Sequence, residues 1–174
     1  MTVTSSNAPR ATTLPRLPEE LVASAAFLLK RLGFVAKEQA LAAYESTGLH
    51  PYHHAVLAVL DEGSRETQGA IADALGYDRG QLVGLLDELE ERGLVERRRD
   101  PADRRRHLVR LTSDGRRALG RLRTLAGRIE DEFFASLDAE ERQQLQALLL
   151  RLAQQHLRGC APEAAAVPDP RAVV

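Results

Sequence analysis

Residues 67–112 read TQGAIADALGYDRGQLVGLLDELEERGLVERRRDPADRRRHLVRLT. The first half of this stretch holds two short amphipathic segments, 67–75 and 78–93, separated by a turn that contains Gly76. Apolar residues recur at helical spacing in both segments, and the second begins at Asp78, a residue type that caps helix N-termini. Two short helices joined by a turn of three or four residues with a glycine are typical of a helix-turn-helix.

In the second half, the residue pattern changes from helical to strand-like spacing and predicts a β-hairpin. LVERRR at 94–99 and RHLVRL at 106–111 are strand-like runs, and DPADRR at 100–105 has the composition of a turn. A hairpin after a helix-turn-helix suits DNA, because the second helix fits the major groove while the hairpin, or wing, lies over the backbone and places an arginine in the minor groove. The alternative interpretation of the arginine run is a solvated charge cluster.

Two helices are expected before this stretch. Apolar residues at spacings of three and four predict one continuous helix over 19–45, with Gly48 after it. Pro51 suits the first turn of a second helix, 53–61.

Two more helices are expected after it. Thr112 is positioned to cap a helix over 112–135. Asp138 and Glu141 form a capping-box pattern before a last helix, 139–157. We expect that helix to bury a stripe of leucines, namely Leu145, Leu148, Leu149 and Leu152. The predicted fold class is therefore mainly α with a small β-hairpin wing.

The ends of the chain lack such periodicity. Residues 1–17 are rich in Ser, Thr and Pro, and residues 159–174 contain three Pro, so both are predicted to be disordered tails around one domain, 18–158. The single cysteine, Cys160, falls in the second tail, where we expect an inert thiol rather than a redox switch.

Composition supports one domain with an apolar core. The 174 residues are 44% hydrophobic and 28% charged, and no apolar run reaches the roughly 18 residues of a membrane span. Acidic Glu19 and Glu20, not basic residues, precede the first apolar stretch, so a secretory signal is not expected. A lone cysteine makes no internal disulfide, which suits a reducing cytoplasm.

The net charge of −1 hides a strong asymmetry. Residues 92–128 contain thirteen Arg and four acidic residues, a local charge of about +9, which is the footprint expected of a nucleic-acid contact. All but two of the 24 basic residues are Arg, whose guanidinium donates paired hydrogen bonds to phosphates and base edges. A genome of high GC content would produce the same bias.

The stretch DRGQLVGLLDELEERGLVER at 78–97 resembles the recognition helix and first wing strand of the MarR family of bacterial transcriptional regulators. The spacing Asp103-x-Arg105-x-x-x-Val109-x-Leu111-Thr112 is similar to the wing signature of that family, and residues 48–60 resemble its second helix. The resemblance extends in order over about residues 20–157.

This resemblance implies a winged-helix homodimer that binds double-stranded DNA. Its dimerisation helices would be 19–47 and 112–157, and its winged helix-turn-helix 51–111. Long Leu/Ala faces on the outer helices also favour a homodimer, because one small lobe cannot cover them. A two-fold dimer would place two recognition helices about one DNA turn apart.

The resemblance also assigns roles to individual residues. The phosphate contacts would come from Thr67 and Gln68 at a helix start, with Arg97 and Arg98 supporting the wing on the backbone. Arg105 would enter the minor groove beside Arg104, steered by Asp103. The residues that would face the major groove are Arg79, Gly80, Gln81, Val83 and Gly84. Family members often carry hydroxyl, polar or basic side chains where this chain has Gly80, Val83 and Gly84, so base reading would rest on fewer side chains.

A second cluster is aromatic and histidine-rich. Family members commonly bind small aromatic or phenolic molecules in a cleft beside the second helix, and the residues that could line it here are Tyr44, His50, Tyr52, His53 and His54. His50 and His54 have a spacing compatible with a metal, but no Cys or carboxylate accompanies them, so we expect no metal or cofactor. The alternative is that they are ordinary polar residues at a helix start.

The sequence therefore predicts a homodimeric repressor of a pseudo-palindromic operator, relieved by a small-molecule ligand. The alternative function is a helical protein–protein adaptor whose basic hairpin binds an acidic protein. No Ser/His/Asp constellation or Gly-rich phosphate loop supports an enzyme. The acidic residues of the recognition helix, Glu88, Glu90 and Glu91, are expected to form a solvated face with Arg92.

Overall fold

The computed structural model describes residues 16–63, 67–101, 103 and 107–157. The chain divides into two units, residues 1–37 and 38–174, and helix α2, Ala25–Glu45, crosses the boundary between them. Within the described residues, no helix combines the length and apolar character that a membrane crossing requires.

The first unit holds a helix break that the sequence analysis did not predict. Instead of one helix over 19–45, a single turn, α1 (Glu19–Val22), ends at Ala23, and α2 begins at Ala25. Between them the Ser24 hydroxyl accepts a hydrogen bond from the backbone N–H of Phe27 at 3.3 Å. Serine side chains compete with helical hydrogen bonds in this way, which favours a new helix start at Ser24.

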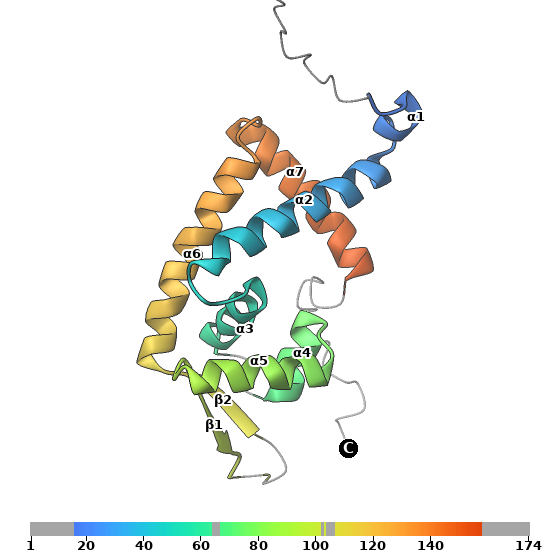
Figure 1. Ribbon diagram of the computed structural model, residues 1–174. Helices are drawn as coiled ribbons and strands as arrows, with labels where there is room; N and C mark the ends of the chain where they lie inside the picture. The colour runs from blue at the N-terminus through green and yellow to red at the C-terminus, as the bar shows by residue number, and fades with distance from the viewer. Residues whose placement is uncertain (1–15, 64–66, 102, 104–106, 158–174) are drawn as a thin grey trace, which may run out of the picture. The chain divides into compact units, whose positions relative to one another are not determined.

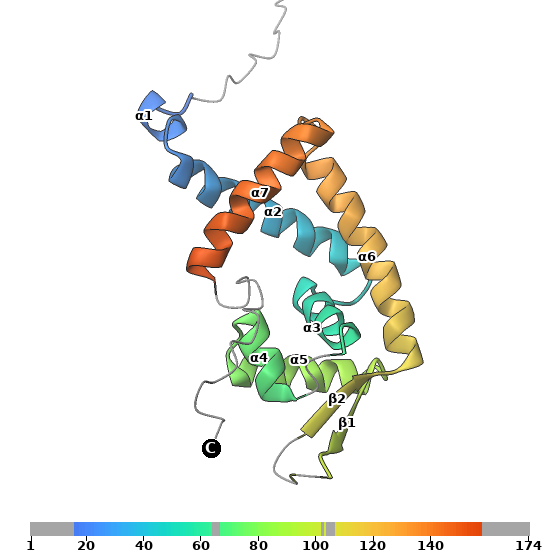
Figure 2. The ribbon, with the colours of Figure 1, turned by 180° about the vertical axis from the view of Figure 1, so that it is seen from behind.

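The second unit contains the helix-turn-helix and the wing. Its elements are α3 (Pro51–Asp61), α4 (Gln68–Leu75), α5 (Arg79–Glu91), β1 (Val95–Arg99), β2 (His107–Leu111), α6 (Ser113–Phe133) and α7 (Ala139–His156). Figures 1 and 2 show α4 and α5 packed beside α3, with the hairpin leaving the end of α5 and α6 running past α3. The predicted fold class, mainly helical with a hairpin wing, is confirmed.

Local capping explains where most of these helices begin. Thr67, Asp78, Thr112 and Asp138 each accept a hydrogen bond on the side chain from a backbone N–H in the first turn of the next helix. At Asp138 the capping box is complete, because the Glu141 carboxylate accepts from the Asp138 N–H at 2.9 Å. Helix α3 begins at Pro51, two residues before the predicted start, with His50 as its N-cap.

The two strands form an antiparallel hairpin in which Val95 pairs with Leu111 and Arg99 with His107. An isolated bridge between Thr67 and Leu108 attaches the residue before α4 to the outer side of the hairpin. The sequence analysis did not foresee this bridge, since nothing in the pattern around Thr67 predicts strand pairing. The bridge brings the start of α4 next to the wing.

The core of the second unit draws on all of its central elements. Its buried members are Tyr44, Val56, Leu57, Leu60, Ile71, Ala72, Leu82, Leu86, Leu89, Val95, Val109, Leu111, Leu119 and Leu122. Leu75 and Leu85 are half-buried against this cluster. The core therefore covers one face of α5, and the opposite face of this helix remains exposed.

The prediction that the last helix buries its leucines is wrong for this chain by itself. Leu148 and Leu152 are 54% and 50% exposed, Leu149 is also exposed, and Leu145 is only half-buried. Helical periodicity identified the apolar stripe correctly. Within the described residues, the groove along this stripe is lined by α7 itself, by Glu130 of α6 and by Phe134 at the C-cap of α6, so most of the stripe remains exposed.

Candidate nucleic-acid interface

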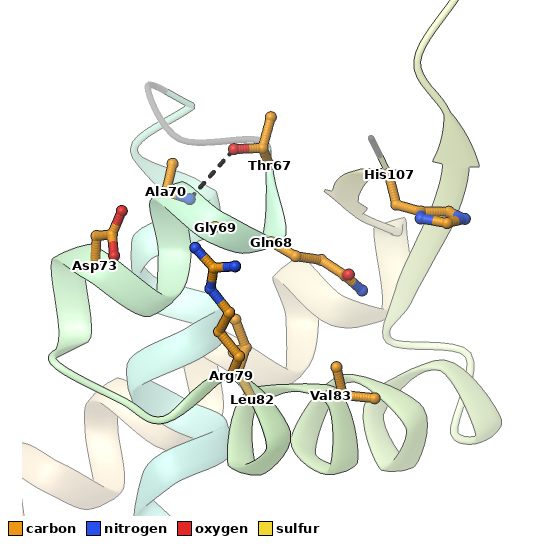
Figure 3. A pocket seen from close by; sticks show the side chains of 9 residues that line it. All are labelled: Thr67, Gln68, Gly69, Ala70, Asp73, Arg79, Leu82, Val83 and His107. Carbon is orange, nitrogen blue, oxygen red and sulfur yellow. Dashed lines mark hydrogen bonds between the residues drawn. The ribbon is translucent and has the colours of Figure 1, made fainter. Parts of the chain in front are cut away.

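An open groove lies where the starts of α4 and α5 meet strand β2. Its volume is about 560 Å³, and its lining residues are Thr67, Gln68, Gly69, Ala70, Asp73, Arg79, Leu82, Val83 and His107. Figure 3 shows the side chains of Gln68, Arg79 and Val83 directed into this space, with His107 across from them on the strand. The groove thus collects residues from three elements on one face.

The start of α4 offers hydrogen-bond donors to this groove. The Thr67 hydroxyl accepts from the Ala70 N–H at 3.2 Å, as the dashed line in Figure 3 shows. Since the first N–H groups of a helix have no partner inside the helix, those of Gln68 and Gly69 point outward at the positive end of the helix dipole. This geometry suits an anion such as a phosphate.

Helix α5 presents a face with few side chains. Asp78 accepts from the N–H groups of Gly80 and Gln81 at 2.8 and 3.3 Å, which fixes the first turn. Leu82, Leu86 and Leu89 face the core, whereas Arg79, Gly80, Gln81, Val83 and Gly84 are exposed, as the sequence analysis expected. A methyl group on Gly84 would meet nothing within 4 Å, so packing inside the chain does not require that glycine.

The wing arginines have unequal surroundings. The side chain of Arg98 is 73% exposed and forms an ion pair with Glu96 of its own strand at 3.0 Å. Arg97 is 21% exposed and contacts two carboxylates of α5. Asp103 is half-buried and has an interaction partner. Arg104 and Arg105 lie outside the described residues.

The expectation of a solvated acidic face on α5 holds for Glu88 and Glu91, which are exposed, and is wrong for Glu90, which is half-buried and bound to Arg97. The exposed Glu88 carboxylate also lies 3.1 Å from the Nε2 atom of buried His53. The hydrogen bonds from Arg97 hold the pKa of Glu90 below its usual value, against a smaller opposing effect of burial.

The histidine and tyrosine residues that the sequence singled out split into two groups. The Tyr44 hydroxyl and His54 Nδ1 lie 2.7 Å apart and link α2 to α3. His50 and His53 instead form the N-terminal cap of α3, because His50 Nδ1 accepts from the Tyr52 N–H and His53 Nδ1 from the His50 N–H. Among the described residues no group of three His, Cys, Asp or Glu side chains could hold a metal ion.

Burial controls the ionisation of this cluster. Desolvation lowers the pKa of His53 below 6.5, and nearby Arg92 and His50 lower it further, while Glu88 raises it. Desolvation and Arg123 likewise lower the pKa of His54. Both shifts favour the neutral rings. Because His53 Nδ1 accepts the cap hydrogen bond from the His50 N–H, the proton of a neutral His53 ring lies on Nε2, which is buried and makes no hydrogen bond within the described residues although Glu88 Oε2 is 3.1 Å away.

Three residues at these sites escaped the sequence analysis. His107 lines the groove from β2, and Asp73 lines it from α4. Tyr77, in the turn of the helix-turn-helix, packs edge-on against Tyr52 with ring centroids 5.5 Å apart, and Tyr52 in turn lies against His50 at 4.6 Å. In the sequence, the signal that could have pointed to Tyr77 is its position in the predicted turn, and His107 and Asp73 have no comparable signal.

Comparisons with known proteins agree with this geometry. The model of the MarR family matches residues 47–106. A Thauera aromatica protein described as a candidate transcriptional regulatory protein for the hcr operon is 33% identical over 132 residues, which make up 71% of this chain and 80% of that protein.

Solved structures give the same result. The transcriptional repressor CouR bound to a 23-mer DNA duplex is 36% identical, with a TM-score of 0.73 over 80% of this chain and 99% of that one. CouR from Rhodococcus jostii RHA1 bound to p-coumaroyl-CoA is 33% identical, with a TM-score of 0.67 over 78% of this chain and 96% of that one. These relatives regulate transcription and are not enzymes. The chain belongs to the MarR family of transcriptional regulators.

Proposed function

We propose that this regulator is a homodimeric repressor that binds a pseudo-palindromic DNA site through α4, α5 and the wing. The observation that carries the proposal is the open groove in which the start of α4, the exposed face of α5 and His107 of β2 meet. A helix N-terminus that binds phosphate, beside a helix that enters the major groove, accounts for this arrangement. The DNA-bound CouR structure supports it.

In this proposal each part of the interface has its own role. Thr67 and Gln68 contact phosphate at the start of α4, and Gln81 reads base edges from the exposed face of α5. Val83, 41% exposed, contacts a thymine methyl group, and the missing side chain of Gly84 lets the helix approach closely. Arg98, Arg104 and Arg105 carry the wing onto the backbone and into the minor groove, with Asp103 orienting Arg105.

The direct test is fluorescence anisotropy with a duplex from the region upstream of the gene and a random duplex of equal length. We expect tighter binding to the upstream duplex and a steep loss of affinity with salt, since each neutralised phosphate contributes about 0.9 to the log–log slope. Gln81→Ala should lose affinity for the upstream duplex only, and Gln143→Ala, on exposed α7, is the matched control. Equal affinity for both duplexes would refute specific binding and favour an adaptor whose hairpin binds acidic proteins.

The homodimer in this proposal rests on the uncovered apolar stripe. A groove of about 310 Å³ runs between α6 and α7, with Phe134, Leu145 and Leu149 among its lining residues. A second copy of the chain would bury this surface, and exposed apolar patches of this kind mark association sites. Light scattering at micromolar concentration should give the mass of two chains; the mass of one chain would refute the dimer.

We further propose that a small aromatic or phenolic molecule relieves repression by binding beside the Tyr44–His54 pair. This pair joins α2 to α3, and α3 contacts α5 through His53 and Glu88, so a ligand at the pair has a physical connection to the recognition helix. Such a ligand need favour a DNA-incompetent arrangement by only a few kcal/mol. The ligand-bound CouR structure supports an effector.

Thermal melting against a panel of aromatic acids, phenols and zinc tests this location, followed by anisotropy with any compound that stabilises the protein. Tyr44→Phe removes only the hydroxyl that contacts His54 and should weaken the effect of the compound. The matched control is Ser46→Ala, which removes an exposed hydroxyl after the end of α2 that lies outside the proposed ligand site. A stabilising compound that leaves DNA affinity unchanged, or that binds the Tyr44→Phe variant equally well, would contradict the proposal.

A further inference from the structure

Arg97 of β1 is held by two carboxylates of the recognition helix. Its Nε atom donates to Glu90 Oε2 at 2.8 Å, and its Nη2 atom lies 2.5 Å from Glu90 Oε2 and 2.6 Å from Asp87 Oδ1. The backbone N–H of Arg97 also donates to Glu90 Oε1 at 3.1 Å. Glu90 therefore uses both carboxylate oxygens on this one residue.

These contacts leave Arg97 poorly suited to bind DNA. The guanidinium has one positive charge and faces two negative ones, so the group as a whole carries a charge of −1. Charge-assisted hydrogen bonds with a forked geometry are among the strongest that proteins form, and a phosphate would have to displace them. The neighbouring Arg98, by contrast, points into solvent.

The position of Arg97 along the strand gives these contacts a mechanical role. Burial falls from Val95, which is in the core, through half-buried Glu96 and Arg97 to exposed Arg98 and Arg99. Arg97 is thus the last residue of β1 with substantial burial before the strand leaves the body of the domain. Beyond it, β1 pairs with β2, and the bridge from Thr67 to Leu108 contacts the other strand.

We propose that Arg97 is a positioning residue which fixes the wing to the recognition helix and does not itself contact phosphate. Asp87 and Glu90 share this role from α5. The three residues set the distance between the exposed face of α5 and the end of the hairpin, so a DNA duplex meets both at a fixed separation. The inference rests on the proposed DNA binding and reassigns Arg97 within it.

Neutralising Glu90 distinguishes a phosphate contact from a positioning role for Arg97, because the two roles predict opposite changes in DNA affinity. If Arg97 contacted phosphate, Glu90→Gln would free its charge and remove a negative charge near DNA, so affinity would rise. If Arg97 positions the wing, Glu90→Gln should lower affinity for the upstream duplex, on the order of tenfold given the strength of charge-assisted pairs. Glu91→Gln is the matched control, since it removes the same charge from the adjacent exposed position and should leave affinity equal or slightly higher.

A conservative substitution gives a second readout. Lysine preserves the charge of a phosphate contact, but its single nitrogen cannot replace the two donors, Nε and Nη2, that Arg97 places on Glu90 while Nη2 also contacts Asp87. Arg97→Lys should therefore bind DNA about as weakly as Arg97→Ala. Hydroxyl-radical footprints of both variants should lose protection in the minor groove that flanks the site and keep protection at its centre. Near-normal affinity and footprint for Arg97→Lys would overturn the proposal.

Hydrogen exchange in the free protein keeps this test independent of DNA. Amides at residues 98–100 should exchange faster in Glu90→Gln than in Glu91→Gln, because the wing has lost its attachment to α5. Faster exchange in a protein that binds no DNA would reject the proposed function but leave the attachment in place. Unchanged exchange, or tighter DNA binding by Glu90→Gln, would reject the positioning role while DNA binding by the wild-type chain stands.

Discussion

Gly115, at the start of α6, leaves the least room for a Cβ atom among the described glycines, and replacing it with alanine should destabilise the domain. An ideal Cβ atom there would lie 2.0 Å from the carbonyl oxygen of Leu94 and 3.2 Å from Leu111 Cδ2. The Leu94 carbonyl cannot simply move away, because it accepts from the Thr112 N–H at 3.1 Å. Thr112 also donates its hydroxyl to the Gly93 carbonyl at 2.7 Å and accepts from the Gly115 N–H.

The size of the loss follows from these contacts. Overpacking costs about 1–3 kcal/mol, and weakening one or two hydrogen bonds at the junction adds about 1 kcal/mol. Alanine returns about 1 kcal/mol through its better helix propensity. We therefore expect Gly115→Ala to lower the free energy of unfolding by about 1–3 kcal/mol, which for a chain of this length is a fall in Tm of about 2–12 °C.

Gly120→Ala on the same helix is the matched control. Its Cβ atom would meet nothing within 4 Å, so only the gain in propensity remains, and stability should rise by about 0.5–1 kcal/mol. Urea unfolding followed by circular dichroism at 222 nm measures both, at one fixed protein concentration because association contributes to stability. If Gly115→Ala matched the wild type, or gained stability as Gly120→Ala does, the close approach and the junction built on it would be wrong.

Three further predictions concern pH, DNA and capping. Because burial lowers the folded-state pKa of His53 and His54, the unfolded chain binds protons more readily than the folded chain. The contribution of these histidines to stability should therefore be complete above about pH 6.5 and fall as the pH drops below that value. Urea midpoints at pH 7.5 and 5.5 measure this effect, and His53→Gln should reduce the difference between them. Gln81→Ala should cost about 1–3 kcal/mol on the cognate duplex and little on random DNA, whereas Arg98→Ala should weaken both and reduce the salt slope by about 1, as anisotropy across a salt series would show. Asp138→Ala removes the cap of α7 and should cost about 1 kcal/mol, measured by thermal melting, and a variant as stable as the wild type would show that the cap contributes nothing.

The features that the sequence predicted well are those set by neighbouring residues. Thr67, Asp78, Thr112 and Asp138 cap helices within three residues of themselves, so their effect can be recognised from a short window. The hairpin follows for the same reason, because its turn composition and its change of period are both local. The exposed positions of α5 are simply the complement of its apolar stripe.

The helix break at Ser24 is a local error, whereas the other errors come from interactions between distant residues. The break at Ser24 depends on a side-chain hydrogen bond that competes with a good helical pattern. The leucines of α7 have the spacing of a buried stripe, but spacing does not tell whether the covering surface belongs to the same chain. Likewise, the contact of Glu90 with Arg97 joins a helix to a strand across a turn, and no helical or strand periodicity predicts it.

The same long-range pairs change what the sequence-derived charge means. Counting residues 92–128 gives about +9, yet three carboxylates from outside that segment bind its arginines: Asp87 and Glu90 at Arg97, and Asp61 at Arg123, 2.9 Å away. Including them lowers the local charge to about +6. Because the salt slope reports phosphates neutralised by cations that reach DNA, it should lie well below the value that counting arginines suggests. In the proposed interface, part of the basic segment therefore attaches the wing and α6 to the domain, and the contact with phosphate is assigned to residues such as exposed Arg98.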